Sequence, residues 1–432
     1  MKKIYLYSAL LIIIALVSLN FNFLGSKKFL TNILGQEIKN SIKRLVLGEQ
    51  GFNDTTYFKG LAYNQKRFPE TQFEKLYLEI TDINLSSKNN SPSYYNKYMG
   101  IKTKYSRFYI EPIKNKILIT YASGDFSYLK IDKEELIQTN YLSKLFGKRI
   151  LNILVHKNNL FISYVWNSEN KPYDKSNIKQ CNYLKVAKAS LSEIFLDFEE
   201  VFKTVDCKNR ISAGKMSFYE SAYPGILLTT DAQFEHRNLA QIKKSSFGKI
   251  ILINTDNYEY KIFSNGHRNP MGLFVGKDII LETEHGPCGG DEINLIEENQ
   301  NYGWPNVSVG DNYTFCRDFK NRKDYSYGKE SLPTADYADP IYSFMPSIGI
   351  SNIVKIPNDF SPYWKDNYFI ASLNGGSLYR VKFNLEFNKI LFVEKIYIGE
   401  RIIDIRYDKN NNQFLLALES YGRLGKLRVD KE

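Results

Sequence analysis

A long succession of short apolar segments separated by polar turns constrains the fold of this chain more than any other feature. It runs from about residue 71 to the C-terminus, with examples such as KLYLEITDINLS, NILVHKNNLFISYVW and FGKIILINTDN. The segments are rich in Ile, Leu, Val, Tyr and Phe and break at clusters of Asn, Asp, Gly and Lys, which is typical of β-strands joined by tight turns. A strand, a Lys-Asn-Asn or Asn-Gly-Gly turn and a second strand recur, as antiparallel hairpins require.

The composition and the length of this region favour one all-β architecture. Aromatic residues make up 15% of the chain, with 32 Tyr and 28 Phe, which favours strands, and no convincing long amphipathic helix follows residue 70. The region is too long for a single sandwich. A propeller of six four-stranded blades, each of about 60 residues, accommodates it and protects the sheet edges. We therefore predict an all-β fold, a six-bladed β-propeller over residues 66–432, with two packed β-domains as the alternative.

The N-terminus predicts a membrane anchor. Two lysines precede a mostly apolar run that ends at Leu24, and two more lysines follow shortly afterwards. The run is long enough to span a bilayer, and the leading charges favour a cytoplasmic N-terminus. We predict a signal anchor, a transmembrane helix, over residues 1–27 and a juxtamembrane helix and linker over residues 28–65. A cleavable signal peptide is the alternative. Both place the remaining chain outside the cytoplasm, anchored on the periplasmic side or secreted.

The net charge does not point to a nucleic-acid partner. The chain carries 58 Lys and Arg against 47 Asp and Glu, a formal charge of +11. These basic residues are scattered among acidic ones and form no long tract, which indicates a solvated surface.

The four cysteines, Cys181, Cys207, Cys288 and Cys316, match no metal-binding CxxC spacing. In an exported chain, two disulfides that join residues 181 to 207 and 288 to 316 are expected. Free buried thiols are the alternative.

The stretch from Gly266 to Pro305, GHRNPMGLFVGKDIILETEHGPCGGDEINLIEENQNYGWP, concentrates the residues that carry chemistry. Its Arg268 stands beside an asparagine, and a guanidinium stacks on planar rings and donates to anionic oxygens. The acidic, Gly-rich loop that starts at His285 offers carbonyl and carboxylate oxygens, which Ca²⁺ prefers. These residue types suit a site for an anionic ligand and a hard cation. The alternative is a structural turn whose acidic residues cap strands or pair with Arg268.

This stretch resembles the signature of the glucose/sorbosone dehydrogenase family, the soluble-type, PQQ-dependent aldose sugar dehydrogenases. The resemblance extends over most of residues 66–432. It implies a propeller that holds the quinone PQQ in a cleft at one end of its channel, together with calcium. A histidine of the family takes the proton of the sugar C1 hydroxyl as hydride moves to the quinone.

The resemblance also assigns residues. It implies that Arg268, Asn269 and Arg401 bind the cofactor, with Arg268 also acting in catalysis. The backbone carbonyls of a Gly-Pro pair would hold the PQQ-linked calcium, and an acidic residue and a tyrosine would hold a second, structural calcium. The implied metal ligands are Gly286, Pro287, Asp291, Glu292 and Tyr302.

The chain departs from the family pattern at three functional positions. The catalytic histidine falls on Ile211, which has no proton-accepting atom. The second arginine of the cofactor clamp falls on Ile403, which cannot neutralise a carboxylate. A basic residue falls near Asn374. Asp231 matches the family's Gly-Asp turn, and the resemblance assigns it to the catalytic site. His236 lies shortly after it as a candidate replacement base. An exposed loop histidine is the alternative for His236.

Two functions of different classes follow from these residues. One is an anchored, extracytoplasmic dehydrogenase that oxidises an aldose at C1 and passes electrons to an acceptor. The other is a catalytically degenerate propeller that binds a glycan or a protein partner. A calcium-dependent hydrolase is a third alternative, although the sequence shows no Ser-His-Asp arrangement to support it.

Overall fold

The computed structural model describes most of the strand-rich part of the chain. Its described residues are 74, 76–83, 94–96, 101–103, 107–131, 135–138, 140–141, 149–167, 179–221, 223–287, 289–310, 337–420 and 422–429. The predicted anchor and the juxtamembrane segment, residues 1–27 and 28–65, lie outside them. Among the described residues, none of the helices is both long enough and apolar enough to cross a membrane.

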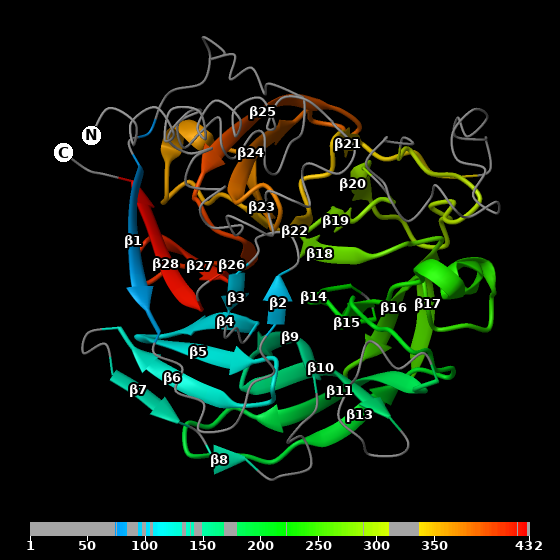
Figure 1. Cartoon of the computed structure of the whole chain (residues 1–432), viewed down its shortest axis with the longest axis horizontal. Helices are drawn as coiled ribbons and strands as arrows, with labels where there is room; N and C mark the ends of the chain where they lie inside the picture. The colour runs from blue at the N-terminus through cyan, green and yellow to red at the C-terminus, as the bar shows by residue number, and fades with distance from the viewer. Residues whose placement is uncertain are drawn as a thin grey trace, which may run out of the picture. The chain divides into compact units, whose positions relative to one another are not determined.

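Six four-stranded antiparallel sheets follow one another around a ring, which confirms the predicted propeller (Figure 1). From the innermost to the outermost strand, the first blade consists of β4 (Phe108–Ile113), β5 (Lys116–Tyr121), β6 (Phe126–Lys130) and β7 (Glu135–Gln138). The second blade consists of β9 (Arg149–His156), β10 (Asn159–Asn167), β11 (Asn182–Ser190) and β13 (Glu199–Lys203). The third blade consists of β14 (Met216–Tyr219), β15 (Gly225–Thr229), β16 (Lys249–Asn254) and β17 (Tyr260–Asn265).

The remaining three blades continue the same order. The fourth blade consists of β18 (Pro270–Val275), β19 (Ile280–Glu284), β20 (Asp291–Leu295) and β21 (Tyr342–Phe344). The fifth blade consists of β22 (Ile350–Lys355), β23 (Asn367–Ser372), β24 (Ser377–Phe383) and β25 (Ile390–Tyr397). The sixth blade consists of β26 (Ile402–Asp408), β27 (Gln413–Leu418), β28 (Arg423–Val429) and β1 (Leu76–Asp82).

The sixth blade closes the ring by joining the two ends of the strand-rich region. Its outermost strand, β1, pairs antiparallel with β28 over their whole length, from Leu76 opposite Val429 to Asp82 opposite Arg423. Alternate β1 side chains, Leu76 and Leu78, pack on the apolar core between the fifth and sixth blades. β1 thus covers the edge of β28 and supplies the fourth strand that the last blade would otherwise lack.

The predicted turn types join neighbouring strands as hairpins. At the Lys-Asn-Asn turn between β9 and β10, Lys157 has φ 54°. At the Asn-Gly-Gly turn between β23 and β24, Gly376 has φ 55°. Positive φ in a short turn matches the twist of the flanking strands, which explains why these residue types recur between strands.

A few short elements lie outside the blades. In the described part of the chain, the 3₁₀ helices η2 (Phe234–Gln241) and η3 (Pro362–Trp364) occupy loops. The strands β8 (Asn140–Tyr141) and β12 (Phe195–Leu196) form a parallel pair. The hairpin of β2 (Tyr94–Asn96) and β3 (Ile101–Thr103) belongs to a separate compact unit, residues 1–63 and 92–104; the propeller unit comprises residues 64–91 and 105–432.

The hydrophobic core lies between the blades. Apolar side chains on facing sheets form separate clusters, as with Ile119 and Phe126 of the first blade against Ile162 of the second, all fully buried. A second cluster joins the second and third blades and contains Ile211. Packing between sheets, rather than within one sheet, therefore holds the ring together.

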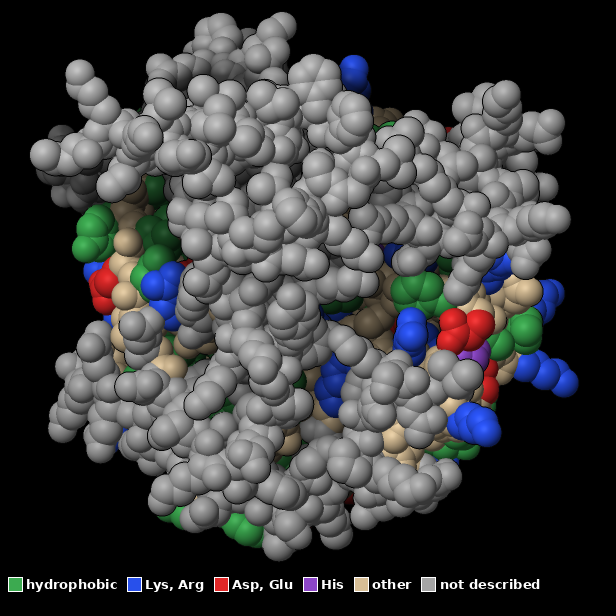
Figure 2. All heavy atoms as spheres, in the orientation of Figure 1, with side chains coloured by type: hydrophobic (Ala, Val, Ile, Leu, Met, Phe, Trp, Pro, Cys, Tyr) green, Lys and Arg blue, Asp and Glu red, His purple; other side chains and the backbone are tan. Residues whose placement is uncertain are grey.

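Charged side chains of both signs share the visible surface of the described residues. In Figure 2, Lys and Arg side chains are scattered among neutral and hydrophobic ones, with Asp and Glu beside some of them. Exposed ion pairs also occur among the described residues, such as Lys355–Asp366 at 3.0 Å. Such pairs contribute at most about 1 kcal/mol, so this surface adds little to the stability of the fold.

A buried ion network joins the inner strands. Asp404 on β26 is fully buried, and its Oδ1 accepts hydrogen bonds from Lys215 Nζ at 2.8 Å and from Asn352 Nδ2 at 2.9 Å. Arg406 Nε lies 3.6 Å from the other oxygen of Asp404 and 3.1 Å from a carboxylate oxygen of Glu111. One carboxylate thus gathers side chains from the third, fifth and sixth blades, and Arg406 links it to the first.

Both charged partners stay ionised in this network. Burial raises the pKa of Asp404, but the Arg406 and Lys215 charges outweigh it and hold the pKa below the ordinary 3.8. Burial lowers the pKa of Lys215 to about 8, against the attraction of Asp404. Lys215 is therefore still predominantly charged at neutral pH, as an ion pair requires.

The closing strand gives a first prediction. Leu78→Ala removes part of the β1 contact with the core and should lower the unfolding free energy by about 1–3 kcal/mol, because this side chain is only half-buried. Tyr77→Ala, on the neighbouring position that points outward, should change it by less than about 0.5 kcal/mol. Urea unfolding followed by circular dichroism measures both. Equal losses would show that β1 does not close the ring through its inner face.

The buried ion network around Asp404 gives a second prediction. Asp404→Asn leaves the buried Lys215 without its counter-ion, whereas Arg406 keeps Glu111, and it should cost about 3–5 kcal/mol of unfolding free energy. Asp366→Asn, in the exposed pair, should cost less than about 1 kcal/mol. Because the folded pKa of Asp404 is lowered, its stabilisation is present above the unfolded pKa of 3.8 and is lost as pH falls through the folded value. The acid limb of a stability–pH profile should therefore be shallower in Asp404→Asn. Parallel profiles would contradict this role.

Candidate functional site

One end of the channel collects the functional positions. Four alternating strands return the chain to the end of the blade where it began, so every inner strand starts at the same end of the ring. The loops between the second and third strands of each blade lie at that end as well. We call this end the mouth. The GHRNP turn before β18, the loop after β19 and the turn before β26 all lie there.

The first residues of the GHRNP turn are fixed by packing. Gly266 has φ 80°, and a Cβ there would collide with the side-chain oxygen of Asn301, so only glycine fits. His267 is fully buried; its Nε2 lies 2.8 Å from Ser264 Oγ and its ring stacks on Tyr302 at 4.7 Å. Burial, reinforced by Lys249, lowers the pKa of His267 to about 3, which keeps the ring neutral.

Glu284 holds the next two residues in place. One of its carboxylate oxygens accepts the backbone N–H groups of Arg268 at 2.8 Å and of Asn269 at 3.2 Å. Burial raises the pKa of Glu284 to about 7, although these two N–H donors and the Arg268 charge act in the opposite direction. The last residue of β19 therefore sets the backbone of the turn that precedes β18.

The side chains of Arg268 and Asn269 meet His285. Arg268 Nη1 donates to the carbonyl of His285 at 2.6 Å, and its guanidinium lies 5.4 Å from the ring of Trp304. The Asn269 amide lies between two loops, with Nδ2 3.2 Å from His285 Nδ1 and Oδ1 accepting from Ser212 Oγ at 3.0 Å. Burial lowers the pKa of His285, so the imidazole is neutral at physiological pH.

The glycine-rich loop after His285 is tightly folded. A Cβ at Gly286 would collide with the carbonyl of Gly290, which explains the glycine. Asp291 Oδ1 accepts from Ser347 Oγ at 2.6 Å and its Oδ2 accepts from the backbone N–H of Ile350 at 2.9 Å. Asp291 therefore attaches the fourth blade to the first residue of β22. Cys288, and with it the predicted disulfide to Cys316, lies outside the described residues.

An acidic cluster lies just beneath the loop, on the neighbouring strands β19 and β20. Antiparallel pairing sets Glu284 opposite Glu292 and Glu282 opposite Asn294, and all four side chains are buried. Asn294 Nδ2 donates to Glu282 Oε2 at 3.0 Å. Burial and mutual repulsion raise the pKa values of Glu282 and Glu292 well above 4.5. So many carboxylates in one buried place require protons or a cation.

This cluster has the geometry of a cation site. One ligand atom each from His267, Glu282 and Glu284 lie within 4.8 Å of one another. Three buried side-chain atoms of this cluster make no hydrogen bond within the described structure: Glu282 Oε1, Asn294 Oδ1 and His267 Nδ1. Tyr302, the other predicted structural ligand, stacks on His267, and its hydroxyl donates to the carbonyl of Leu295 at 2.5 Å.

Asp231 belongs to a different buried pair. Its Oδ2 lies 2.6 Å from Lys208 Nζ, and its Oδ1 accepts the backbone N–H groups of Ser212 and Ala213 at 2.9 and 3.2 Å. Burial raises its pKa, but Lys208 and these donors lower it below the ordinary value. Asp231 thus orders the loop around Ile211, whose side chain is fully buried in the core between the second and third blades.

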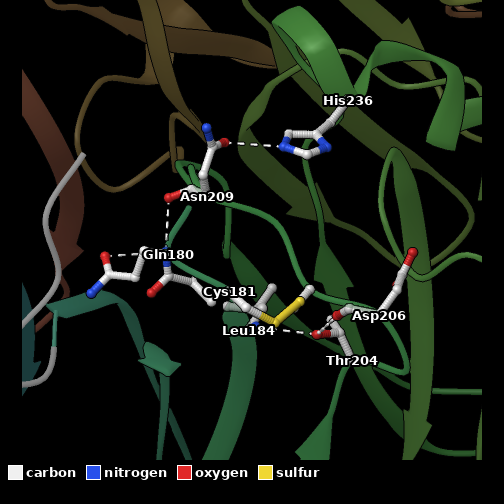
Figure 3. The surroundings of a disulfide bond; sticks show 9 residues. Gln180, Cys181, Leu184, Thr204, Asp206, Asn209 and His236 are labelled. Carbon is white, nitrogen blue, oxygen red and sulfur yellow. Dashed lines mark hydrogen bonds between the residues drawn. A yellow bond between two sulfur atoms is a disulfide. The ribbon is translucent and has the colours of Figure 1, made fainter. Parts of the chain in front are cut away.

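His236 lies on η2, next to the chain segment that the disulfide tethers (Figure 3). Its Nε2 is 3.0 Å from Asn209 Oδ1, and its side chain is 29% exposed. Cys207, two residues before Asn209, is bonded to Cys181, which confirms the first predicted disulfide. The partners of His236 are thus Asn209 and, at 4.0 Å, Glu235, whereas Arg268 and Asn269 contact His285.

The remaining predicted cofactor-binding residue, Arg401, lies directly before β26. The side chain of Arg401 is 20% exposed, and its Nη2 lies 3.9 Å from Glu419 Oε2. Ile403 is buried in the apolar cluster that joins the first, second and sixth blades. Asn374 donates its backbone N–H to the carbonyl of Ile348 at 3.0 Å. The structure therefore supplies no side chain at Ile211 or Ile403 that would replace the family's histidine or second arginine.

The structure joins some predicted residues and separates others. Arg268, Asn269 and the loop from His285 form one group. The loop of Asp231, in the third blade, reaches this group through the hydrogen bond from the Ala232 backbone N–H to the Arg268 carbonyl at 2.9 Å, whereas His236 contacts Asn209. Glu282, Glu284 and His285 were not singled out by sequence. The signal for the two glutamates is their spacing: Glu282 and Glu284 alternate within an otherwise apolar strand, which places both on one buried face.

Comparison with known proteins agrees with this architecture. Aldose sugar dehydrogenase YliI of Escherichia coli is 30% identical over 171 residues, 39% of this chain and 43% of the relative. Quinoprotein glucose dehydrogenase B of Acinetobacter calcoaceticus is 29% identical over 163 residues, 35% of this chain and 31% of the relative. The chain thus matches less than half of the length of each of these curated relatives.

Solved structures share the fold. The apo-form of soluble aldose sugar dehydrogenase from Escherichia coli matches with a TM-score of 0.61 and 20% identity, over 76% of this chain and 96% of that one. The PQQ-bound aldose sugar dehydrogenase from Streptomyces coelicolor gives 0.56 and 15%, over 83% and 99%. The family model for glucose / sorbosone dehydrogenase matches residues 114–426, well over half of the sequence. The chain therefore belongs to the glucose/sorbosone dehydrogenase family.

Proposed function

We propose that this protein is a PQQ-binding, calcium-stabilised propeller of the sugar dehydrogenase type, which oxidises an aldose at C1. The observation that carries the proposal is the group at the mouth in which Glu284 fixes the backbone of Arg268 and Asn269 beside His285. The names of the relatives support the substrate class, and one neighbouring structure is PQQ-bound. When bound, PQQ would supply the two-electron acceptor.

The residues at the mouth suit the binding of an anionic quinone better than proton transfer. A half-buried guanidinium at Arg268, an amide at Asn269 and a second guanidinium at Arg401 supply donors for carbonyl and carboxylate oxygens. A proton acceptor at Ile211 is missing, since that side chain is apolar and fully buried. We therefore assign Arg268, Asn269 and Arg401 to binding and derive no proton transfer from position 211.

Calcium is the metal that we propose for the acidic cluster. Carboxylate and carbonyl oxygens at flexible geometry are the ligands of Ca²⁺. The buried Glu282 Oε1 and Asn294 Oδ1 atoms, which make no hydrogen bond, fit such an ion beside Glu292 and Tyr302. A bound cation would neutralise the repulsion among the three glutamates and stabilise the β19–β20 hairpin that carries the loop from His285. The carbonyls of Gly286 and Pro287 are the proposed ligands of a second calcium, next to the cofactor.

A second function has one observation in its favour. A fully buried Ile211 in place of the family's base favours a propeller that binds a glycan or a protein partner without turnover. Both functions use the mouth, and they differ in whether electrons leave the sugar.

The place of action that we propose is outside the cytoplasm. The apolar N-terminal segment, residues 1–27, would anchor the chain in the membrane. The disulfide between Cys181 and Cys207 supports an oxidising compartment. An electron acceptor of the dehydrogenase would then have to be present on the same side of the membrane.

The calcium proposal predicts a ligand-dependent stability. At 100 times its dissociation constant, Ca²⁺ should raise the unfolding free energy by about 2.7 kcal/mol, and EDTA should reverse the effect. Glu292→Gln should abolish the increase, whereas Glu298→Gln, in an exposed pair with Lys261, should retain it. Thermal unfolding of each variant with and without Ca²⁺ measures this. An equal increase in both variants would place the ion elsewhere.

The dehydrogenase proposal predicts cofactor binding and sugar-dependent dye reduction. Wild-type protein loaded with PQQ and Ca²⁺ should show saturable quinone absorbance and reduce a redox dye with aldoses. Ile211→His, which supplies a proton-accepting side chain at this position, should raise the turnover number by about 100-fold or more. Ile211→Leu is the apolar control. PQQ binding without dye reduction would favour the non-catalytic function, and absence of PQQ binding would exclude the dehydrogenase.

A further inference from the structure

The flank of the second blade contains a cavity that is separate from the group at the mouth. Its volume is about 830 Å³, which falls within the roughly 300–1,000 Å³ of small-molecule sites in proteins. It is lined by β10, by β11, by the start of β13 and by the two residues that precede β13. Its lining includes neither Arg268 nor any residue of the loop from His285.

Strand pairing sets the main lining side chains on one face of the blade. Tyr164 stands opposite Lys185, and Ala187 follows two positions further along β11, so all three point to the same side. This side faces the first blade, because Tyr164 and Ala187 share an apolar cluster with Phe126 of that blade. The sheets of a ring diverge toward its rim (Figure 1), so a space between the outer strands of neighbouring blades is expected.

The loop between β11 and β13 supplies one wall of the cavity and is attached to the first blade. Tyr128 of β6 donates its hydroxyl to the carbonyl of Ser192 in this loop at 3.2 Å. Further along the loop, the ring of Phe198 lies 5.4 Å from the ring of Phe126. The wall to which Phe198 belongs therefore has a fixed position, which lowers the cost of ordering the site around a ligand.

An aromatic ring and an ion pair hold one another in place within the cavity. Lys185 Nζ lies 3.8 Å from the centre of the half-buried Trp166 ring and 2.5 Å from Glu200 Oε2. The side chain of Lys185 is 10% exposed, whereas that of Glu200 is 43% exposed. The cation–π contact fixes the ring, and the ion pair fixes the ammonium group above it.

The hydroxyl of Tyr164 is a buried polar group that the described residues leave unsatisfied. Tyr164 is 5% exposed and lines the cavity, and its hydroxyl has no hydrogen-bond partner among the described residues. Burial raises the pKa of Tyr164, and the charge of Glu200 acts in the same direction, so the hydroxyl keeps its proton. An unsatisfied buried hydroxyl is costly, so a ligand group that pairs with it here is favourable.

The polar and aromatic groups of the cavity match the chemistry of a sugar. Each sugar hydroxyl both donates and accepts hydrogen bonds. The Tyr164 hydroxyl does the same, Lys185 donates and Glu200 accepts. Trp166 and Phe198 offer apolar surface on which the C–H groups of a sugar ring pack.

The charges of the cavity disfavour a multiply charged ligand. Lys185 and Glu200 neutralise one another, whereas Asp197 and Glu199 are exposed, so that water and salt screen their charges. The other cationic lining residue, Lys188, donates its ammonium to the hydroxyl of Tyr258 at 3.1 Å. The interior therefore offers a neutral ligand both donors and acceptors without a large field of one sign.

We propose that this cavity on the second blade is a binding site for a neutral saccharide, which it holds without chemical conversion. Tyr164, Lys185 and Glu200 would bind the hydroxyl groups, and Trp166 and Phe198 would pack on the ring. The inference does not rest on the proposed function, because none of these residues belongs to the group at the mouth.

The test uses three saccharides whose C1 hydroxyl is blocked, so that oxidation at C1 is impossible: trehalose, methyl β-glucoside and methyl β-galactoside. Isothermal titration of the full chain should show saturable binding of at least one. Tyr164→Phe removes only the unsatisfied hydroxyl and should raise the dissociation constant about 3- to 10-fold, as expected for one neutral hydrogen bond. Tyr363→Phe is the matched control and should leave it unchanged, because Tyr363 is 62% exposed on η3 of the fifth blade.

A second measurement locates the bound saccharide. Trp166 lines the cavity, whereas Trp304 lies beside Arg268 at the mouth. Binding should therefore change the tryptophan fluorescence of the wild type. Trp166→Phe, which keeps an aromatic wall, should lose this change but still bind in the calorimeter. Thermal unfolding of each variant identifies any loss that comes from misfolding.

The possible outcomes separate this site from the mouth and from a cation site. Binding that Tyr164→Phe weakens and Asn269→Ala does not weaken supports the cavity. Loss in Asn269→Ala alone places the sugar at the mouth and overturns the proposal, as does absence of binding of all three saccharides to the wild type. Spermidine binding that Glu200→Gln weakens, without saccharide binding, identifies a cation site and also overturns it. PQQ takes no part in these measurements, so the proposed function stands or fails separately.

Discussion

The carboxylate of Asp404 is the contact on which the inner ring depends. A propeller has no central sheet, so its blades need another connection along the axis. Here one buried charge binds Lys215 and Asn352, and Arg406 carries the link on to Glu111. Arg406 also donates to the backbone carbonyls of Ile110 and Ile153, in the first and second blades. These ion pairs and hydrogen bonds hold the inner strands at defined positions, and they thereby fix the positions of the adjoining loops at the mouth.

The mouth shows how a site is assembled when the residues come from different blades. Glu284, at the end of one strand, fixes the turn before the strand beside it, and Asp231 does the same for the loop around Ile211 in the neighbouring blade. In both cases a carboxylate accepts backbone N–H groups of a loop that carries functional positions. The two loops then meet through Ser212 and Asn269. The backbone beside Ile211 is thus held by Asp231, although the isoleucine side chain itself offers no proton acceptor.

The sequence was sufficient for the fold and for part of the site. Short strands and hairpin turns predict the propeller, and the GHRNP and HGPCGGDEIN motifs predict the group around Arg268, because their residues are close together in the chain. The buried group of Asp404 with Lys215 and Asn352 could not be predicted, since only the ring brings their blades together. The sequence contained a signal for Glu282, because a charged residue stands inside a buried strand. Its partner Asn294 lies on another strand, however, so the sequence did not reveal the contact. The burial of Ile211 likewise depends on packing between blades, which no single segment reveals.

The pairing of β1 with β28 has a consequence for how the chain is made. These two strands are separated by nearly the whole propeller, so that Glu79 pairs with Lys426, 347 residues further on. During synthesis the β1 strand emerges first and its partner last, and it waits with an unsatisfied edge while five blades form. Contacts of such long range fold slowly. Ring closure should therefore be the last step of folding, and an export machinery or chaperone that shields the N-terminal strand would have its greatest effect before the final blade appears.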